Sequence, residues 1–460
     1  MKKASLLLLF VAAATVSLAQ NTKSLHQLQQ DFVDLRFGMF IHFNMPTFAP
    51  EDWPDPDMPV SAFNPTKLNC AQWAEAAKAA NMSYGCLTTK HHSGFCIWDT
   101  KTTDYNSMNS PVHKDVVREY VDSFRAAGLK VMLYYSILDT HHRLRPGFIT
   151  RDKVNMLKAQ LKELLTDYGE VTALIIDGWD APWSRISYDD VPFQEIYEYV
   201  KSLQPNCLVM DLNAAKYPRE ALFYTDIKSY EQGAGQKIST SENRLPALAC
   251  LSIQRTWFWK ESMPTDKLKD VAWLVNENIV PYNKAYCNFI LNVAPNREGL
   301  MDKNAVEALK KIGSMWRNDD RVAEVPVAEA PIIQHNIAKH CPAESSWSYD
   351  MEIMDFANDD NFSTCWMPSP LIDKAHWEVY LGGPKTINMV TITEYKAGGI
   401  QEYNLEYLAD GCWHPLASGG AFNRVAVVRF PAVRAESVRL NITKKSPEAG
   451  VSEVGVYSVE

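Results

Sequence analysis

The sequence predicts an α/β protein: a (β/α)8-like TIM barrel followed by a C-terminal all-β sandwich domain. From residue 31 to residue 316, short apolar runs typical of strands alternate with segments of helical periodicity, which favours parallel β/α architecture. These runs are apolar throughout, as expected for strands that are buried on both faces. After residue 317 the pattern changes to short strands with period-two alternation. The 460 residues are enough for one large domain and one smaller domain.

Each element of the barrel is predicted from its own pattern. The helices show one apolar face at a spacing of three and four residues, as Val117, Tyr120, Val121 and Phe124 do. The predicted strands are Phe37–Phe43, Tyr84–Thr89, Val131–Ser136, Leu174–Ile176, Cys207–Leu212 and Asn288–Val293. The predicted helices are Cys70–Ala80, Val116–Ala127, Val154–Tyr168, Phe193–Leu203 and Val306–Trp316.

The first 19 residues have the pattern of a secretory signal peptide. Lys2 and Lys3 form a positive start, an apolar run covers residues 6–14, and Ser17-Leu18-Ala19 is a small-residue cleavage pattern. The apolar run is shorter than the roughly 20 residues that a membrane span needs. We therefore expect an exported protein, periplasmic or secreted, without membrane insertion.

The domain limits follow from changes in composition. We assign residues 20–320 to the barrel, 321–335 to a linker and 336–460 to the sandwich. The linker contains Ala323–Pro331, a run rich in Ala, Glu, Val and Pro. Turn signals such as Gly382-Gly383-Pro384 separate the strands beyond it, which favours an antiparallel sandwich. These predicted strands are Trp377–Leu381, Ile387–Thr393, Tyr403–Leu408, Val425–Phe430 and Ser437–Ile442.

Polar residues stand at the C-terminal end of nearly every predicted barrel strand. In a (β/α)8 barrel these strand ends build the active site. The rival architecture is an open doubly wound sheet, but the sequence has no Gly-rich phosphate turn after its first strand. The polar strand-end residues are His42, His91, His92, Asp139, Asp177, Asp211 and Asn213.

Composition and motif spacing exclude several function classes. The formal net charge of −9 argues against a protein that tracks nucleic-acid phosphates. The nine cysteines form no CxxC pair, and the paired His91-His92 lacks the HExxH spacing, so we expect no metal and no cofactor. The 13 Trp are more than a core alone needs, and Trp side chains commonly serve as stacking platforms for sugars.

Asp177 is the sharpest catalytic candidate. It ends an apolar run, and Gly178 after it allows a ligand to approach the backbone closely. A carboxylate beside Trp179 and Trp183 suits an oxocarbenium-like transition state, as nucleophile or as electrostatic stabiliser. A second carboxyl group must act as general acid and base. The candidates, among which spacing alone does not choose, are Glu220, Glu231 and Glu242.

Five stretches, in order along residues 30–318, resemble the motifs of glycoside hydrolase family 29, the retaining α-L-fucosidases. Ile175-Ile176-Asp177-Gly178 falls where this family has its nucleophile. Thr89–Trp98 resembles the family's KHHDGF-x-x-W signature, with Ser93 in place of its Asp. The other matching stretches are Phe37–Phe43, Phe63–Ala74 and Asn288–Gly299.

Within this family the chain is more similar to the branch that acts on α-1,3- and α-1,4-linked fucose. Asp226–Gly235 resembles that branch's DIRWVGNE-x-G segment, whose Glu is the acid/base, and this implies Glu231 in that role. Leu248 and Cys250 stand where the branch has Glu and Asp. The resemblance implies that the substrate-binding residues are His42, Glu51, Trp53, His91, His92, Tyr134 or Tyr135, and Trp257.

The C-terminal part resembles discoidin-like β-sandwiches, the coagulation-factor C type with a galactose-binding-like fold. Asn361–Trp366 is similar to the start of such domains, and Trp377–Leu381 falls where one of their strands does. In some proteins these domains bind glycans, and in others they only brace the catalytic domain. The sequence leaves both roles open.

Together these implications predict an exo-acting, retaining α-L-fucosidase that hydrolyses terminal α-1,3/1,4-linked L-fucose by double displacement. Its partner would be a fucosylated oligosaccharide or glycoconjugate. Two alternatives stay open. One is a glycan-binding protein with a degenerate, weakly active or inactive barrel, which Leu248 and Cys250 favour. The other is an exo-glycosidase for a related sugar.

Overall fold

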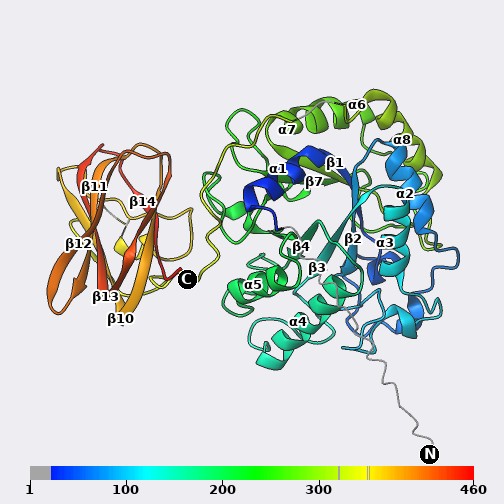
Figure 1. The fold of residues 1–460 in the computed structure, drawn as a ribbon, viewed down its shortest axis with the longest axis horizontal. Helices are drawn as coiled ribbons and strands as arrows, with labels where there is room; N and C mark the ends of the chain where they lie inside the picture. The colour runs from blue at the N-terminus through cyan, green and yellow to red at the C-terminus, as the bar shows by residue number, and fades with distance from the viewer. Residues whose placement is uncertain (1–21, 320–321, 350, 352, 460) are drawn as a thin grey trace, which may run out of the picture.

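The first domain of the computed structural model is a nearly closed barrel of eight parallel strands (Figure 1). The structure describes residues 22–319, 322–349, 351 and 353–459, and the predicted signal peptide at 1–19 lies outside them. The strand order is β5-β4-β3-β2-β1-β8-β7-β6. The strands are β1 Phe37–Ile41, β2 Tyr84–Lys90, β3 Lys130–Ser136, β4 Ala173–Asp177, β5 Leu208–Asp211, β6 Lys228–Glu231, β7 Ala247–Ser252 and β8 Cys287–Asn292. The predicted barrel is therefore confirmed, and β6 and β7 are strands that the sequence patterns missed.

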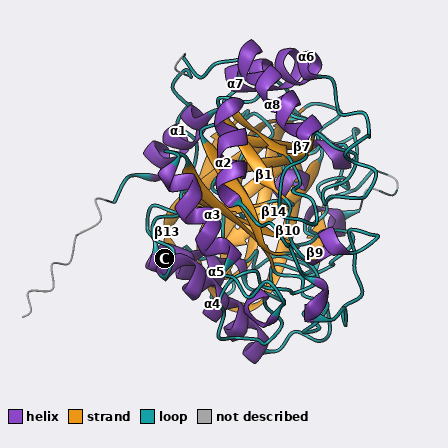
Figure 2. Cartoon of the chain, turned by 90° about the vertical axis from the view of Figure 1, so that its right-hand side faces the viewer, coloured by secondary structure: helices purple, strands orange, loops and turns teal. Residues whose placement is uncertain are grey.

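Helices cover the outside of most of the barrel (Figure 2). Polar side chains begin several of them: Asn69 accepts from Gln72 N at 3.0 Å, and Asp115 accepts from Arg118 N at 2.8 Å. The helices are α1 Leu25–Leu35, α2 Cys70–Ala79, α3 Val116–Ala126, α4 Arg151–Thr166, α5 Phe193–Leu203, α6 Val271–Leu274, α7 Val280–Lys284 and α8 Lys303–Met315. A π-helical turn, Val275–Ile279, joins α6 to α7.

The barrel interior is apolar and is closed at its amino end. Phe40 of β1 packs inside the barrel, whereas its neighbours Met39 and Ile41 pack outward against the helices. Helix α1 closes the amino end, where Phe32 joins the inner cluster and its carbonyl accepts from Asn288 Nδ2 at 2.8 Å. A substrate can therefore enter the barrel only from the carboxyl ends of the strands.

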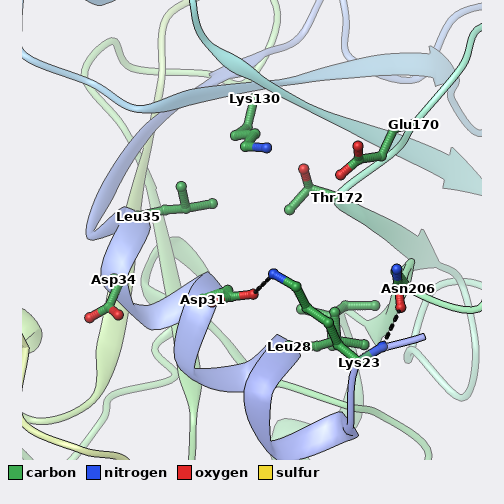
Figure 3. Close-up of a pocket in the computed structure, with 10 residues that line it drawn as sticks. Lys23, Leu28, Asp31, Asp34, Leu35, Lys130, Glu170, Thr172 and Asn206 are labelled. Atoms are coloured by element: carbon green, nitrogen blue, oxygen red, sulfur yellow. Dashed lines mark hydrogen bonds and ion pairs between the residues drawn. The ribbon is translucent and has the colours of Figure 1, made fainter. Parts of the chain in front are cut away.

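A cavity of about 340 Å³ lies beside α1, on the amino side of the barrel (Figure 3). Lys23 and Asp31 form an ion pair of 2.6 Å there, and the Lys23 backbone N donates to Asn206 Oδ1 at 3.0 Å. These contacts fasten the start of α1 to the segment before β5. None of the residues predicted to bind substrate lines this cavity.

The barrel wall between β5 and β6 is bridged by the residues just before β6: Asp226 N donates to Val209 O at 2.8 Å, and Asp211 N donates to Thr225 Oγ1 at 3.2 Å. Among the described residues these two strands are not paired with each other, and no α-helix connects β5 to β6 or β6 to β7. The C-terminal part of the chain covers this side. Tyr224 N donates to Ile332 O at 2.9 Å, and the rings of Tyr217 and Phe223 lie 5.2 and 5.8 Å from that of Phe362. The C-terminal domain thus takes the place of the missing outer helices.

The predicted linker and the C-terminal domain also contact the loop between β4 and α5. His335 Nδ1 lies 2.6 Å from Asp189 Oδ1, and Lys339 Nζ lies 3.8 Å from Asp189 Oδ2. Lys339 is itself paired with Asp360 of the C-terminal domain at 2.9 Å. Because this loop begins directly after Asp177, the second domain supports the barrel beside the predicted site.

The C-terminal domain is an antiparallel sheet structure consistent with a β-sandwich. Its strand order is β12-β11-β13-β10-β14, with β9 beside β10. The strands are β9 Ala343–Ser345, β10 Ala375–Glu394, β11 Ile400–Ala409, β12 Cys412–Gly420, β13 Val425–Lys445 and β14 Val451–Tyr457. The predicted division of residues 377–393 into two strands is wrong, because β10 runs through the Gly-Gly-Pro signal with a register shift between Tyr380 and Lys385. The predicted division of residues 425–442 is wrong in the same way, because β13 is continuous.

Candidate active site

A cavity of about 220 Å³ opens at the carboxyl end of the barrel. It is lined by strand-end residues and by residues of the loops that follow the strands. Most of these side chains are buried, so the base of the cavity is closed. The lining residues are Phe40, His42, Asp52, Trp53, His91, His92, Asp177, Trp183, Leu212, Glu231, Trp257 and Phe258.

Asp177 lies at the end of β4 and is held by polar donors. Tyr134 Oη donates to Oδ2 at 2.6 Å, and Asn213 Nδ2 donates to Oδ1 at 2.7 Å. Burial raises the pKa of this carboxyl group, and the two side-chain donors and the Gly178 backbone N–H act in the opposite direction. Gly178 has φ 113°, a conformation that glycine adopts readily. The chain can therefore turn sharply after Asp177.

Glu231 lies at the end of β6 and faces the same cavity. Burial raises its pKa to about 7, the charge of Asp177 adds to this rise, and a hydrogen bond with the Trp257 side chain opposes it. The other two candidates for the acid/base lie elsewhere. Glu220 contacts Arg219 at 3.2 Å, and Glu242, whose side chain is 58 % exposed, pairs with the same arginine. Among the three, only Glu231 lines the cavity with Asp177.

Three histidines form one wall of the cavity. His42 Nδ1 lies 2.8 Å from Asn292 Oδ1, and His92 Nδ1 lies 2.8 Å from Ser136 Oγ, so both rings are fixed in orientation. Burial lowers the pKa of His42 and His92 to about 3 and holds that of His91 well below its usual value. All three rings are therefore neutral near pH 7 and suit hydrogen bonding to sugar hydroxyls.

Aromatic side chains form an adjoining wall that packs directly against the histidines. The Trp257 ring lies 4.8 Å from that of His42 and 6.2 Å from that of Phe40, and Phe258 lies 5.2 Å from His42. This wall is apolar except for the Trp257 indole N–H. It suits the apolar face of a small sugar, while the adjoining histidines suit the hydroxyls.

The alternation of β3 separates the two tyrosine candidates. Tyr134 points into the barrel and contacts Asp177. Tyr135 points outward, where its Oη donates to Gln160 Oε1 at 2.5 Å. Of the two, the structure places only Tyr134 beside the cavity.

The loop after β1 carries three successive residues, 51–53, that differ in whether they line the cavity. Glu51 is exposed and does not line the cavity. Asp52 does, with its Oδ2 accepting from Trp257 N at 3.3 Å and its Oδ1 2.9 Å from Lys260 Nζ. Trp53 stacks on His92 at 4.7 Å. For Asp52 the only signal in the sequence was its position between Glu51 and Trp53. The lining residues that were not among the predicted site residues are Phe40, Asp52, Trp183, Leu212 and Phe258.

Two further strand-end residues lie outside the cavity. Asp211 accepts from Tyr188 Oη at 2.6 Å and from Asn213 N at 2.9 Å, so it orients the loop that carries Asn213. Burial raises its pKa to about 7. Asp139 is fully buried against Lys90.

Leu248 and Cys250 are also buried inside the barrel, where Cys250 pairs in register with Glu231.

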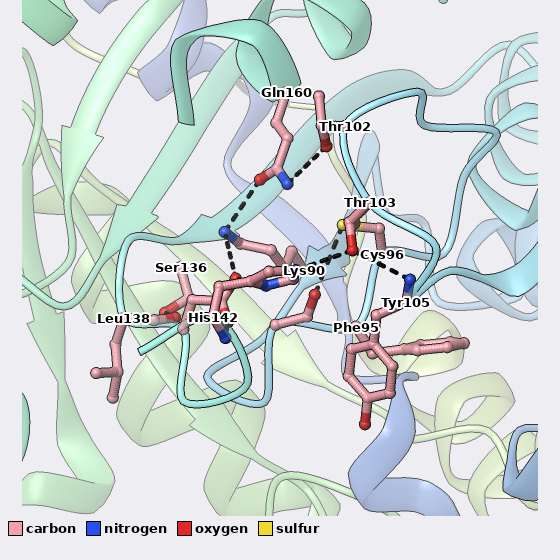
Figure 4. Close-up of polar contacts among 12 residues, drawn as sticks. Lys90, Phe95, Cys96, Thr102, Thr103, Tyr105, Ser136, Leu138, His142 and Gln160 are labelled. Atoms are coloured by element: carbon pink, nitrogen blue, oxygen red, sulfur yellow. Dashed lines mark hydrogen bonds and ion pairs between the residues drawn. The ribbon is translucent and has the colours of Figure 1, made fainter. Parts of the chain in front are cut away.

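A buried polar network holds the loops behind the histidines (Figure 4). Lys90 Nζ lies 3.5 Å from Asp139 Oδ2 and donates to Tyr135 Oη at 3.0 Å and to Gln160 Oε1 at 3.1 Å. Asp139 also accepts from His142 N at 2.8 Å. Lys90 immediately precedes His91 and His92, and thus the network fixes the strand end from which both rings project.

Replacing Lys90 with Met should destabilise the protein strongly. Both partners of the Lys90–Asp139 pair are fully buried, and removing one leaves an uncompensated charge, which typically costs about 3–5 kcal/mol. Urea unfolding followed by circular dichroism measures the change. Lys101→Met is the control, because the Lys101–Asp99 pair is exposed and its loss should leave the free energy of unfolding almost unchanged. Equal stabilities of the two variants would contradict the importance of the network.

No group of three or more His, Cys, Asp and Glu side chains that could hold a metal ion occurs in the described part of the chain. Within the same residues, no helix combines the length and the apolar character required to cross a bilayer.

Comparison with known families gives two matches along the chain. The model of the family described as "Alpha-L-fucosidase" matches residues 51–320. The model described as "F5/8 type C domain" matches residues 342–454. The first match covers the barrel from the loop after β1 onward, and the second covers the antiparallel domain.

Individual relatives agree with these matches. Alpha-L-fucosidase 1 of Arabidopsis thaliana is 27% identical over 459 residues, covering 91% of this chain and 84% of the relative. Tissue alpha-L-fucosidase of Bos taurus is 25% identical over 326 residues, covering 61% of this chain and 66% of the relative. Among solved structures, alpha-L-fucosidase isoenzyme 1 from Paenibacillus thiaminolyticus has the same fold with a TM-score of 0.56 and 23% identity, covering 92% of this chain and 100% of that one.

Proposed function

The chain belongs to the alpha-L-fucosidase family of glycoside hydrolases, and on this basis we propose that it is an exo-acting, retaining enzyme that releases terminal α-1,3- or α-1,4-linked L-fucose from glycans. The observation that carries the proposal is the pairing of two carboxyl groups in one closed cavity. Burial raises the pKa of both groups, but hydrogen bonds oppose the rise at Asp177, whereas the charge of Asp177 adds to the rise at Glu231, whose pKa is about 7. Such a difference suits one nucleophile and one acid/base.

The proposed reaction is a double displacement. Asp177 attacks the anomeric carbon of fucose as Glu231 donates its proton to the leaving glycosidic oxygen, which gives a covalent fucosyl-enzyme. Glu231, now ionised, takes a proton from water, and the water oxygen displaces Asp177. Fucose leaves with its anomeric configuration retained, and both carboxyl groups return to their starting protonation states.

The shape of the cavity supports exo action. It is closed at its base by Phe40, and its volume of about 220 Å³ leaves little room beyond one sugar. The neutral His42, His91 and His92 would bind the fucose hydroxyls. The Trp257 and Phe258 wall would contact its apolar side, which includes the methyl group.

The linkage preference is proposed from one segment. Asp226–Gly235 resembles the branch for α-1,3/1,4-fucosyl linkages, and Glu231 of this segment lies beside Asp177. Hydrolysis of an aryl α-L-fucoside and of a Lewis-type trisaccharide tests both the fucosidase activity and the linkage preference. Release from the trisaccharide supports the linkage. Release from the aryl fucoside alone supports the enzyme but not the linkage, and release from neither, in folded protein, favours a glycan-binding protein.

Export is a separate proposal that rests on the pattern of residues 1–19. N-terminal sequencing of the protein recovered from the periplasm or the culture medium tests it. A mature chain that begins near residue 20 supports export, and an intact Met1 in the cytoplasm contradicts it.

The activity should fall as pH rises through about 7. Glu231 must be protonated to act as the acid, and its pKa is raised to about 7. Above that pH the protonated form of Glu231 is lost, so kcat/KM should fall. Because the charge of Asp177 contributes to this rise, Asp177→Asn should lower the pKa of Glu231. Carbon NMR titration of selectively labelled Glu measures the shift. An unchanged pKa in the variant would contradict the coupling of the two carboxyl groups.

A further inference from the structure

Two tryptophans stand out among the residues that line the cavity. Trp53 is 48% exposed and Trp183 is 42% exposed, whereas Phe40, Asp177 and Phe258 beside them are buried. The exposed pair therefore marks the mouth of the cavity. A group attached to the bound fucose can leave the cavity through this mouth.

The rings at the mouth are in contact with one another. Trp53 and Trp183 meet edge to face with 5.4 Å between ring centroids, and Trp183 lies 4.2 Å from the ring of His92. Exposed large aromatic side chains in contact are unusual on a soluble protein unless they bind something. The negative face of an aromatic ring attracts the C–H groups of a pyranose, which carry partial positive charge.

The loop that carries Trp183 is held in place by its own hydrogen bonds. Trp179 Nε1 donates to Val191 O at 2.8 Å, and Asp180 N donates to Ile186 O at 2.7 Å. His335 of the predicted linker and Lys339 of the C-terminal domain pair with Asp189 at the far end of the loop. Trp183 is thus presented to solvent by an ordered loop, which reduces the entropy that binding would cost.

From these observations we infer that Trp183, together with Trp53, forms the subsite for the sugar to which the fucose is attached. This inference rests on the proposed function and adds its substrate class: the leaving group is a pyranose with an apolar face. The pyranose stacks on Trp183 while Glu231 protonates the oxygen that joins it to fucose. Trp183 is thereby a specificity-determining residue for oligosaccharide substrates.

The test compares two substrates of unequal size. α-L-Fucosyl fluoride has no leaving sugar, and a Lewis-type trisaccharide has one. Trp183→Ala should lower the ratio of kcat/KM for the trisaccharide over the fluoride about 10- to 100-fold, the range of a strong binding contact. Trp183→Phe, which keeps an aromatic face, should restore most of the ratio.

The matched control is Trp273→Ala. Trp273 is 43% exposed on α6 and does not line the cavity, so its loss should leave the ratio unchanged. An unchanged ratio for Trp183→Ala overturns the inference. The inference is also overturned if kcat/KM falls equally for both substrates, because Trp183 would then act on the fucose itself or through His92.

A second measurement separates this inference from the proposed function. Saturation-transfer NMR detects binding of N-acetyllactosamine, the fucose-free leaving part, to the Asp177→Asn protein. Binding that Trp183→Ala abolishes and Trp273→Ala preserves supports the subsite even if the unmodified protein hydrolyses neither substrate, an outcome that would refute the proposed function alone. Binding that is absent, or insensitive to Trp183, overturns the subsite.

Discussion

Asp177→Asn should lower kcat for an aryl α-L-fucoside by about 10⁴-fold or more, because the amide cannot form the covalent intermediate. The substitution should not harm folding. Burial disfavours the charged carboxylate, and the neutral amide has nearly the same shape. Release of the aryl group measures kcat, and thermal unfolding measures stability.

The matched control is Asp180→Asn. Asp180 lies three residues further along the same loop, pairs with Lys216 and does not line the cavity, so this variant should keep most of its activity. Azide gives a second readout. With Asp177→Gly it should produce β-L-fucosyl azide by direct displacement. Full activity of Asp177→Asn would show that another residue is the nucleophile.

Glu231→Ala should lower kcat/KM for a natural glycan by about 10²- to 10⁴-fold, the range typical of lost acid/base catalysis. The loss should be smaller for an aryl fucoside, because its good leaving group needs less protonation. Added azide should accelerate the variant by attacking the fucosyl-enzyme. The product should be α-L-fucosyl azide, with retained configuration, which proton NMR identifies.

Glu220→Ala and Glu242→Ala serve as comparisons for Glu231→Ala. Neither carboxylate lines the cavity, and both contact Arg219, so neither variant should respond to azide. If one of them loses activity and recovers it with azide while Glu231→Ala does not, the acid/base role moves to that residue.

Much of the barrel was predictable because its strands are apolar and its helices amphipathic. Most predicted elements differ from the observed ones by three residues or fewer at each end. The strands β6 and β7 were missed for a physical reason. β6 is only Lys228–Glu231, with a lysine, a serine and a glutamate, and no α-helix follows it. The alternation of strand and helix, which identified the other strands, is absent there.

The site was predictable where it depends on strand ends. His42, His91, His92 and Asp177 come together because parallel strands bring their carboxyl ends to one rim. The choice of Tyr134 over Tyr135 was not predictable, because an apolar strand buried on both faces shows no sign of which residues point inward.

Loop residues were harder to predict than strand ends. Trp183 reaches the cavity through a loop whose path depends on tertiary contacts, and Asp52 does so through the loop after β1. The continuity of β10 across two glycines and a proline was missed for a related reason, since turn signals mark irregular backbone but do not show whether pairing resumes beyond it.

The cover that the C-terminal part gives to the side of β5 and β6 has a consequence for how the protein can be divided. A large apolar patch that loses its cover favours aggregation of a soluble protein. In the intact chain, Ile332 and Phe362 pack over this side, against the segment that joins β5 to β6. A barrel expressed without residues 322–460 would expose the buried rings of Tyr217 and Phe223, and it should aggregate through this apolar patch rather than persist as a soluble catalytic fragment.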